Sequence, residues 1–155
     1  MTDMKSNSIK IICQNRKAYH EYTILETLQA GIALTGTEVK SIREGKIKLD
    51  EGWIDITEHE EAILRQVHIN PYHHGNIYNH AETRERKLLL KKKEIRRLAN
   101  AVHAKGMSII PLKVLFIGSM VKIQIGLAKG KKDYDKREDS KKKDAERDIQ
   151  RAFRH

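Results

Sequence analysis

The alternation of apolar and polar residues along the chain predicts a body built mainly of short strands. Segments in which every second residue is apolar, or which are rich in β-branched residues, are bounded by glycine, proline or acidic turns. The predicted strands are 22–34 (with an interruption or bulge at Ala30-Gly31), 53–56, 62–69, 86–90, 109–116 and 121–127. The acidic turn 58–61 and the turn Gly118-Ser119 each predict a hairpin between the strands that flank them.

Two segments have the periodicity of a helix instead. In 92–105 the apolar residues recur at i, i+3, i+4 and i+7, and Gly106 follows as a helix end. A shorter helix is predicted for 37–44, with Val39 and Ile42 on its buried side and Gly45 after it. Together these elements predict a mainly β fold with flanking helices. The expected form is a small, partly open, OB-like β-barrel, with a β-sandwich as the alternative; OB barrels often bind oligonucleotides.

The strand pattern also predicts which side chains point outward. In 121–127 the apolar set faces the core, so Lys122 becomes an exposed cation. In 86–90 Leu88 and Leu90 share one face, and Leu89 points to the other among basic residues. An outward leucine flanked by cations is able to pack on a sugar or base while the cations bind phosphates. The alternative is a surface leucine that covers the neighbouring helix.

The charge of the chain favours a polyanionic partner. Its 155 residues carry a formal net charge of +10, with 34% charged and 39% hydrophobic residues. The apolar runs are too short to span a membrane, and the N-terminal residues lack the apolar core of a signal peptide. The single Cys13 excludes an intrachain disulfide and a multi-thiolate zinc site. We therefore expect a protein of the reducing cytoplasm with no membrane partner.

Catalytic and metal-binding patterns are absent from the sequence. The glycine-containing run 126–132 lacks the Ser or Thr and the strand–loop–helix setting of a P-loop, and the serines occupy no nucleophile-elbow pattern. Four histidines invite a metal interpretation but have no ligand spacing on a helix: His68, His73, His74 and His80. We interpret them as loop residues near a polyanion. The prediction is a protein that is not an enzyme and has no cofactor or metal.

The composition changes at Lys129. Residues 129–155 hold 11 Lys and Arg against 7 Asp and Glu and little apolar surface, so this tail is expected to be disordered when alone. A weak apolar stripe at helical spacing, including Ile149 and Phe153, suits a helix formed on a partner. The alternative is a solvated tail that only aids solubility. The expected organisation is a flexible N-terminus (1–14), an OB-like RNA-binding barrel (15–128) and a charged tail (129–155).

Several segments together resemble the small protein B (SmpB) family, in order and at family spacing. They are 15–18 (NRKA), 30–32 (AGI), 35–43 (TGTEVKSIR), 68–72 (HINPY), 75–80 (GNIYNH), 86–90 (RKLLL), 128–132 (AKGKK), 134–137 (YDKR) and 147–148 (RD). The runs TGTEVKS and GKKDYDKR are the most specific. The resemblance covers nearly the whole chain from Asn15 onward.

This resemblance implies a fold and a function. Members are OB-like barrels that bind the tRNA-like domain of transfer-messenger RNA (SsrA RNA). The RNA, charged with alanine and carried with elongation factor Tu and GTP, enters stalled ribosomes. The tail passes the small-subunit decoding centre and lies as a helix in the empty mRNA channel. Translation then switches to the RNA's own reading frame, which encodes a degradation tag (trans-translation).

The resemblance also implies site residues. RNA contact is expected at Leu89, Lys122 and Gln29, although most members carry Glu at the last position, and an amide keeps a hydrogen bond but no ionic role. With the neighbouring basic residues, the expected RNA-binding set is Gln29, Arg84, Arg86, Lys87, Leu89, Lys122, Lys129, Lys131 and Lys132. The set expected at the decoding centre and in the mRNA channel is Tyr134, Asp135, Lys136, Arg137, Lys141, Lys142, Lys143 and Arg147. Some members have His where Tyr134 stands, which indicates that stacking on a ribosomal base is the shared property.

A second function class remains open at this point. A general OB-fold RNA-binding protein or a ribosome-associated structural protein would also combine a barrel with a basic tail. Such a protein would bind many RNAs with similar affinity, whereas a partner of transfer-messenger RNA would be selective.

Overall fold

The computed structural model describes residues 8–73 and 79–131, together with residues 137 and 141. Over this part of the chain three helices and nine strands follow one another. Their order is β1 (Ile9–Gln14), α2 (Arg16–Glu21), β2 (Tyr22–Ile32), α3 (Gly36–Arg43), β3 (Ile47–Lys48), β4 (Trp53–Ile56), β5 (Ala62–Arg65), β6 (His68–Ile69), β7 (Arg86–Leu89), α4 (Lys92–Lys105), β8 (Ser108–Ile117) and β9 (Met120–Gly130). The predicted mainly β fold is therefore confirmed.

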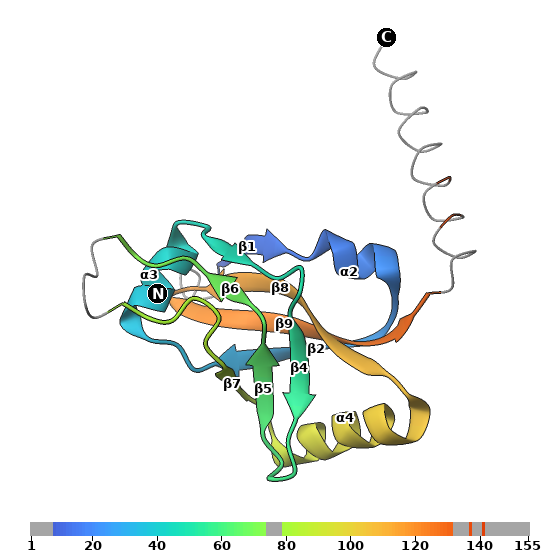
Figure 1. Ribbon diagram of the computed structural model, residues 1–155. Helices are drawn as coiled ribbons and strands as arrows, with labels where there is room; N and C mark the ends of the chain where they lie inside the picture. Colours follow the sequence, from blue (N-terminus) through green and yellow to red (C-terminus); the bar gives the residue numbers. More distant parts are fainter. Residues whose placement is uncertain (1–7, 74–78, 132–136, 138–140, 142–155) are drawn as a thin grey trace.

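Seven of the strands form one antiparallel sheet in the order β1-β8-β9-β2-β7-β5-β4, and β3 and β6 form a small second sheet. Within the described residues no pairing joins the two edge strands, so the sheet stays open. It is bent, however, because β1 pairs with the second half of β8 while β4 also contacts β8. Figure 1 shows α2 and α3 at opposite ends of the sheet and α4 along its lower side.

The strand bulges lie elsewhere than expected. The pairing of β2 with β9 is regular through Ala30-Gly31 and shifts instead between Ile24 and Glu26. A second shift falls between Pro111 and Lys113 in β8. An extra residue in a strand reverses which face the following side chains occupy. Ile24 stands just before the first shift and Leu112 is the extra residue of the second, and both belong to a separate apolar cluster under α2.

The N-terminal expectation was wrong for the residues that the structure describes. Residues 9–14 form β1, which pairs with β8 along its length. The short helix α2 follows and was also missed. Asn15 caps it: its Oδ1 accepts from the Ala18 amide, and its Nδ2 donates to the Leu49 and Pro111 carbonyls. An edge strand whose outer side chains stay in solvent has no clean apolar alternation to reveal it.

The two predicted helices form close to their expected bounds. α4 spans Lys92–Lys105, and Gly106 ends it in the left-handed conformation with φ 64°, as its sequence pattern predicts. α3 begins with a capping box between Thr35 and Glu38. Ile42 of α3 is buried as expected, while Val39 is only half-buried. No helix in the described part of the chain has the length and apolarity needed to cross a membrane.

The boundary of the tail also moves. Lys129 was expected to begin it, but β9 continues to Gly130, with Lys129 paired to Thr23. The amide of Lys131 then donates to the Glu21 carbonyl over 2.8 Å. Hydrogen bonding to the body therefore extends at least to Lys131.

Candidate nucleic-acid interface

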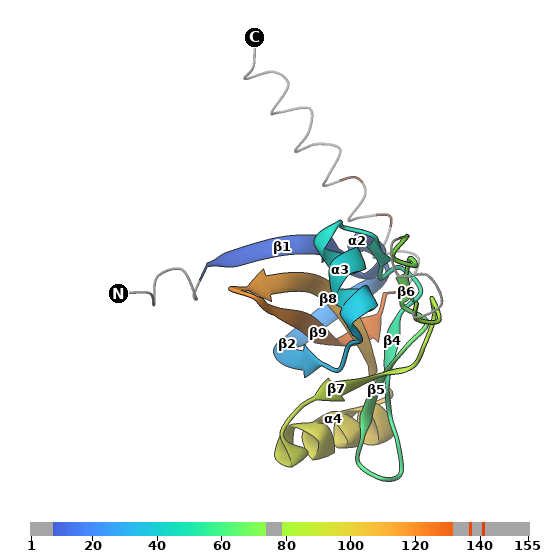
Figure 2. The same ribbon diagram turned by 90° about the vertical axis from the view of Figure 1, so that its left-hand side faces the viewer.

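One face of the sheet carries two rows of side chains that run across neighbouring strands. The strand register defines these rows, because directly paired residues point to the same side. The first row is Leu89, Gly31, Lys122, Leu115 and Ile11, from β7 to β1. The second row is Gln29, Gln124, Lys113 and Gln14. We call these nine positions the open face; Figure 2 shows the strands that carry it, with β1 at its upper edge.

Leu89 projects from the open face as the sequence predicted. It is 58% exposed, whereas its neighbour Leu88 is 1% exposed and lies in the core. Gly31 makes room for it, since a Cβ atom on Gly31 would lie 3.2 Å from the Leu89 Cβ. Beside this pair is a hollow of about 250 Å³, lined in part by Met120 and Lys122. An exposed leucine next to a small apolar hollow offers a contact surface for a sugar or a base.

The row places Lys122 two strands away from Leu89, with Gly31 between them. Its side chain is half-buried rather than fully exposed. Within the described residues no salt bridge occupies it. A lysine in this state packs its aliphatic stem on the sheet and keeps its ammonium group for a ligand. Gln29 is exposed in the next row, paired with Gln124. The structure therefore brings the three residues implied by the family resemblance onto one surface.

Arg86 is a correction to the predicted RNA-binding set. Its side chain is fully buried, and its Nε donates to Glu38, which is also fully buried. The remaining guanidinium nitrogens donate to backbone carbonyls, among them Val67 over 2.9 Å and Glu82 over 3.1 Å. Such a guanidinium has no group left for RNA. The alternation of the strand explains the error, because Arg86 shares the core face with Leu88.

The Arg86–Glu38 pair ties α3 to β7, the strand that presents Leu89. Burial alone raises the pKa of Glu38, but hydrogen bonds from Arg84, the Thr35 amide and Arg86 outweigh it and hold the pKa below its usual value. Burial lowers the pKa of Arg86, and Glu38 opposes that effect. Glu38 is the glutamate of the run TGTEVKS, so this residue has a structural role in holding α3 against β7.

The other two predicted basic residues near this strand, Arg84 and Lys87, also have acidic partners. Arg84 donates through Nη2 to Glu38 over 2.6 Å and to the Ala33 carbonyl over 3.2 Å. Lys87 is exposed and lies 3.3 Å from a carboxylate oxygen of Glu61. An exposed pair of this kind is weak and exchanges readily for another anion. Lys87 is therefore more accessible to a phosphate than Arg84 is.

The basic residues near the tail form a separate group. Lys129 is exposed, seven positions along β9 from Lys122, and Lys131 donates through Nζ to the Tyr19 carbonyl over 3.2 Å. Arg137 and Lys141 are exposed. The remaining predicted tail residues lie outside the described residues: Lys132, Tyr134, Asp135, Lys136, Lys142, Lys143 and Arg147.

The sequence alone did not reveal the apolar extension of the open face. Ile11 is 49% exposed and Met120 is 58% exposed, and Leu115 lies between Lys122 and Ile11. The predicted strand 109–116 contained Leu115. Its outward direction depends on the bulge after Pro111, which shifts the alternation by one residue. The outward direction of Leu115 could therefore be assigned only from the register of β8 with β9.

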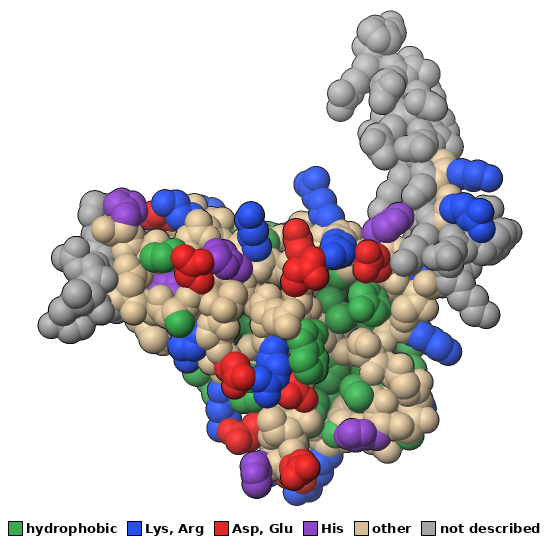
Figure 3. Space-filling model, in the orientation of Figure 1, with side chains coloured by type: hydrophobic (Ala, Val, Ile, Leu, Met, Phe, Trp, Pro, Cys, Tyr) green, Lys and Arg blue, Asp and Glu red, His purple; other side chains and the backbone are tan. Residues whose placement is uncertain are grey.

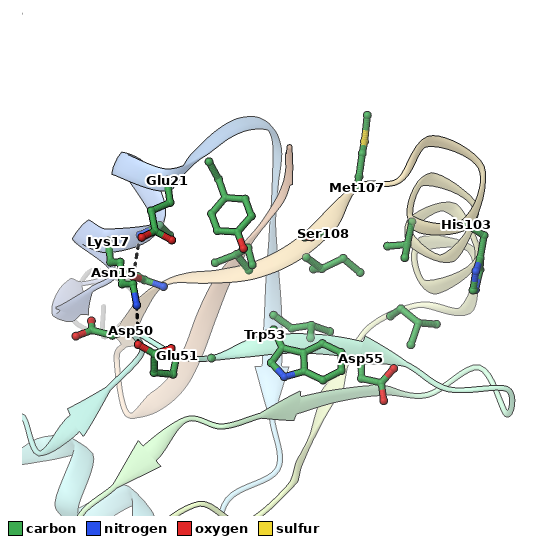
Figure 4. A pocket seen from close by; sticks show the side chains of 18 residues that line it. Asn15, Lys17, Glu21, Asp50, Glu51, Trp53, Asp55, His103, Met107 and Ser108 are labelled. Atoms are coloured by element: carbon green, nitrogen blue, oxygen red, sulfur yellow. Dashed lines mark hydrogen bonds and ion pairs between the residues drawn. The ribbon is translucent and has the colours of Figure 1, made fainter. Parts of the chain in front are cut away.

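A second hollow, of about 430 Å³, lies between α2, β4, α4 and β8 and differs in charge. Figure 4 shows Glu21, Asp50, Glu51 and Asp55 around it, with Trp53 at its wall. On the face drawn in Figure 3, hydrophobic side chains gather beside Asp and Glu side chains. A polyanion is repelled by this rim, so the open face is the better nucleic-acid surface.

Of the four histidines that invite a metal interpretation, His80 is bonded into the fold. His80 is hydrogen-bonded through Nδ1 to the Thr37 hydroxyl and through Nε2 to the Ile69 carbonyl, both over 2.9 Å. His68 lies 3.2 Å from Glu82. His73 contacts the Tyr72 ring, and His74 is outside the described residues. Across the described part of the chain, no three potential ligands converge as a metal site would require.

Comparison with known proteins places the chain in a family. The family model described as "SmpB protein" matches residues 12–155. An SsrA-binding protein of Carboxydothermus hydrogenoformans is 54% identical over 145 residues, covering 94% of this chain and 97% of that protein. One of Enterococcus hirae is 51% identical over 146 residues, with 94% of each chain covered. A chain of the solved structure described as "tmRNA-SmpB: a journey to the center of the bacterial ribosome" is 45% identical with a TM-score of 0.66, covering 79% of this chain and 85% of that one. The chain belongs to the SmpB protein family.

Proposed function

We propose that this protein binds the tRNA-like domain of transfer-messenger RNA and delivers it to stalled ribosomes for trans-translation. The observation that carries the proposal is the open face, where Leu89, Lys122 and Gln29 lie together on a rigid sheet. A cation without a salt bridge in the described structure, an exposed apolar side chain and an amide supply the three kinds of contact that structured RNA needs. Family membership supports it, since the relatives are named SsrA-binding proteins.

In this proposal the bent, open sheet is the OB-like barrel that was expected from the sequence. β4 contacts β8 without pairing in the described structure, and this contact supports a partly open barrel. In this proposal the tail beyond Lys131 makes the contacts with the ribosome. Its cations meet ribosomal phosphates in the decoding centre and the mRNA channel, and Tyr134 stacks on a base. Elongation factor Tu with GTP joins through the RNA, and the cytoplasm is the site of action.

A selectivity measurement tests this function. The full chain is titrated with the tRNA-like domain of the host's transfer-messenger RNA, with a canonical tRNA and with an unrelated hairpin of equal length, at one fixed salt concentration. We expect tighter binding of the tRNA-like domain by about 1,000-fold over the hairpin, the lower end of the range typical of specific over non-specific binding. Equal affinity for all three RNAs would identify the protein as a general RNA-binding or ribosome-associated structural protein instead.

A further inference from the structure

A basic pocket lies at the β8–β9 turn, beyond the end of the open face. It has a volume of about 550 Å³ and is lined by Ser8, Lys10, Ile12, Arg43, Phe116, Gly118 and Ser119. We call it the turn pocket. Its lining contains two cations and two hydroxyl groups but no carboxylate. This composition is the opposite of the acidic hollow beside α2.

The two cations of the turn pocket come from different elements. Lys10 lies on β1 opposite Phe116 of β8, and Arg43 lies in the last turn of α3. The Arg43 guanidinium lies over the Phe116 ring, 5.8 Å from its centroid. Such a cation–π contact positions the guanidinium and leaves its N–H groups free to donate.

Neither cation is neutralised by the part of the protein that the structure describes. Lys10 and Arg43 take part in none of the salt bridges between described residues, in contrast to Arg84, Arg86 and Lys87. The carboxylate nearest Arg43 in sequence, Glu44, is paired with Lys46 over 3.2 Å. Two convergent cations with hydroxyl donors beside them form a site for a doubly hydrogen-bonded oxyanion such as a phosphodiester.

The turn pocket meets the open face at the β8–β9 turn. Its Lys10–Phe116 pair adjoins the Ile11–Leu115 pair of the open face along β1 and β8, so it points to the opposite side of the sheet. Ser119 lines both this pocket and the hollow beside Leu89, and Met120 and Lys122 follow it along β9. We propose that the turn pocket binds a backbone phosphate of the same RNA, so that the bound strand passes from Leu89 and Lys122 around the β8–β9 turn to Lys10 and Arg43. The proposal rests on the proposed function and extends the contact surface beyond the residues that the family resemblance implied.

The experiment measures binding of the tRNA-like domain as a function of KCl concentration for the full chain and four variants. Lys10→Gln and Arg43→Gln each remove one charge, and the double variant removes both. We expect each single variant to lose about ten-fold in affinity near 0.1 M salt, since each loses a charge-assisted hydrogen bond. If the two cations bind one phosphate, the double variant flattens the slope of log K against log salt by about 0.7–0.9 in total. Arg43→Lys keeps the charge and should retain most of the slope.

Two controls separate this inference from the proposed function. Lys105→Gln removes an equal charge at the end of α4, a helix that contributes no residue to the pocket, and should leave the slope unchanged. Lys122→Gln should flatten the slope because it lies in the proposed main contact. If Lys122→Gln weakens binding and the Lys10/Arg43 double variant binds like the unmodified chain, the turn pocket is not an RNA site although the proposed function stands. If the unmodified chain shows no preference for the tRNA-like domain, the proposed function itself fails.

A competition arm identifies the ligand class. Inorganic phosphate at constant ionic strength is titrated against the chain alone and against its RNA complex. An RNA-backbone site predicts weak phosphate binding that the double variant and bound RNA both abolish. Phosphate binding that persists unchanged in the RNA complex would assign the pocket to a free anion and overturn the proposal.

Discussion

At the scale of single residues, the basic side chains next to Leu89 in the sequence have different surroundings although their sequence setting looks alike. Arg84, Arg86 and Lys87 stand within four positions, yet Arg86 is buried, Arg84 is held by Glu38, and Lys87 has only an exposed partner. The two-residue period of β7 puts Arg86 and Lys87 on opposite faces of the sheet, while Arg84 precedes the strand. Charge in the sequence therefore overstated the number of cations accessible to a phosphate, while the outward direction of Leu89, which follows from the same period, was predicted correctly.

The first residue-scale prediction concerns Lys122 and Leu89. Lys122→Ala should weaken binding of the tRNA-like domain and flatten its salt slope by about 0.7–0.9, because one phosphate contact is lost. Leu89→Asp should weaken binding without a matching loss of a cation, since it replaces an apolar contact by a repelled carboxylate. Fluorescence titration across a salt series measures both, with circular dichroism as the check on folding. Unchanged affinity in both folded variants would remove the open face from the interface.

The second residue-scale prediction uses Gly31. A Cβ atom at this position would lie 3.2 Å from the Leu89 Cβ and 3.3 Å from its Cδ1, closer than most side chains tolerate. Gly31→Ala should therefore displace Leu89 and weaken RNA binding by several-fold with the salt slope unchanged, because no charge is altered. Gly130→Ala is the matched control, since nothing lies within 4 Å of its added Cβ. An equal effect of both substitutions would argue against a role for the Gly31–Leu89 contact.

At the scale of elements, periodicity predicted the strongly patterned helix α4 and the hairpins β4–β5 and β8–β9. It missed β1 and α2 because an exposed edge strand and a six-residue helix carry little pattern. It also misplaced the bulge of β2, since the contact of Ile24 with the cluster under α2 is long-range information. The direction of Leu115, which depends on the second bulge, could not be predicted for the same reason.

The element-scale prediction tests the link between α3 and β7. Glu38→Gln leaves Arg86 buried without its charge partner and should lower the free energy of unfolding by ~3–5 kcal/mol at pH 7. The pKa of Glu38 is held below its usual value, so its stabilisation is present above the ordinary glutamate pKa of about 4.3 and is lost as the pH falls through the lower folded pKa. Urea unfolding should therefore show the difference between the two proteins shrinking below about pH 4.

The double variant Glu38→Gln/Arg86→Met provides the control for this pair. It removes both charges from the interior, so it should recover part of the stability lost by Glu38→Gln. A double variant less stable than the single one would show that Arg86 stabilises the fold through its bonds to the Val67 and Glu82 carbonyls more than through Glu38.

At the scale of the whole molecule, the hydrogen bonding of the body gives a place at which to divide it from the tail. β9 pairs with β2 as far as Gly130, and the Lys131 amide still donates to Glu21. A cut after Ala128, where the composition changes, would remove the Lys129–Thr23 and Gly130–Tyr22 pairs from the sheet. A cut after Lys131 keeps every described strand and the whole open face.

The last prediction follows from that division. A chain that ends at Lys131 should fold and bind the tRNA-like domain selectively, because the open face and the turn pocket are complete in it. It should fail in transfer of the nascent peptide to the alanyl-charged RNA, since no segment would then occupy the decoding centre and the mRNA channel. The physical reason is that ordering the charged tail costs entropy, which only phosphate contacts inside that channel offset. A single-turnover peptidyl-transfer assay on stalled ribosomes measures this. Full-rate transfer by the shortened chain would move the function into the body, and loss of RNA binding would make the tail the RNA-binding element.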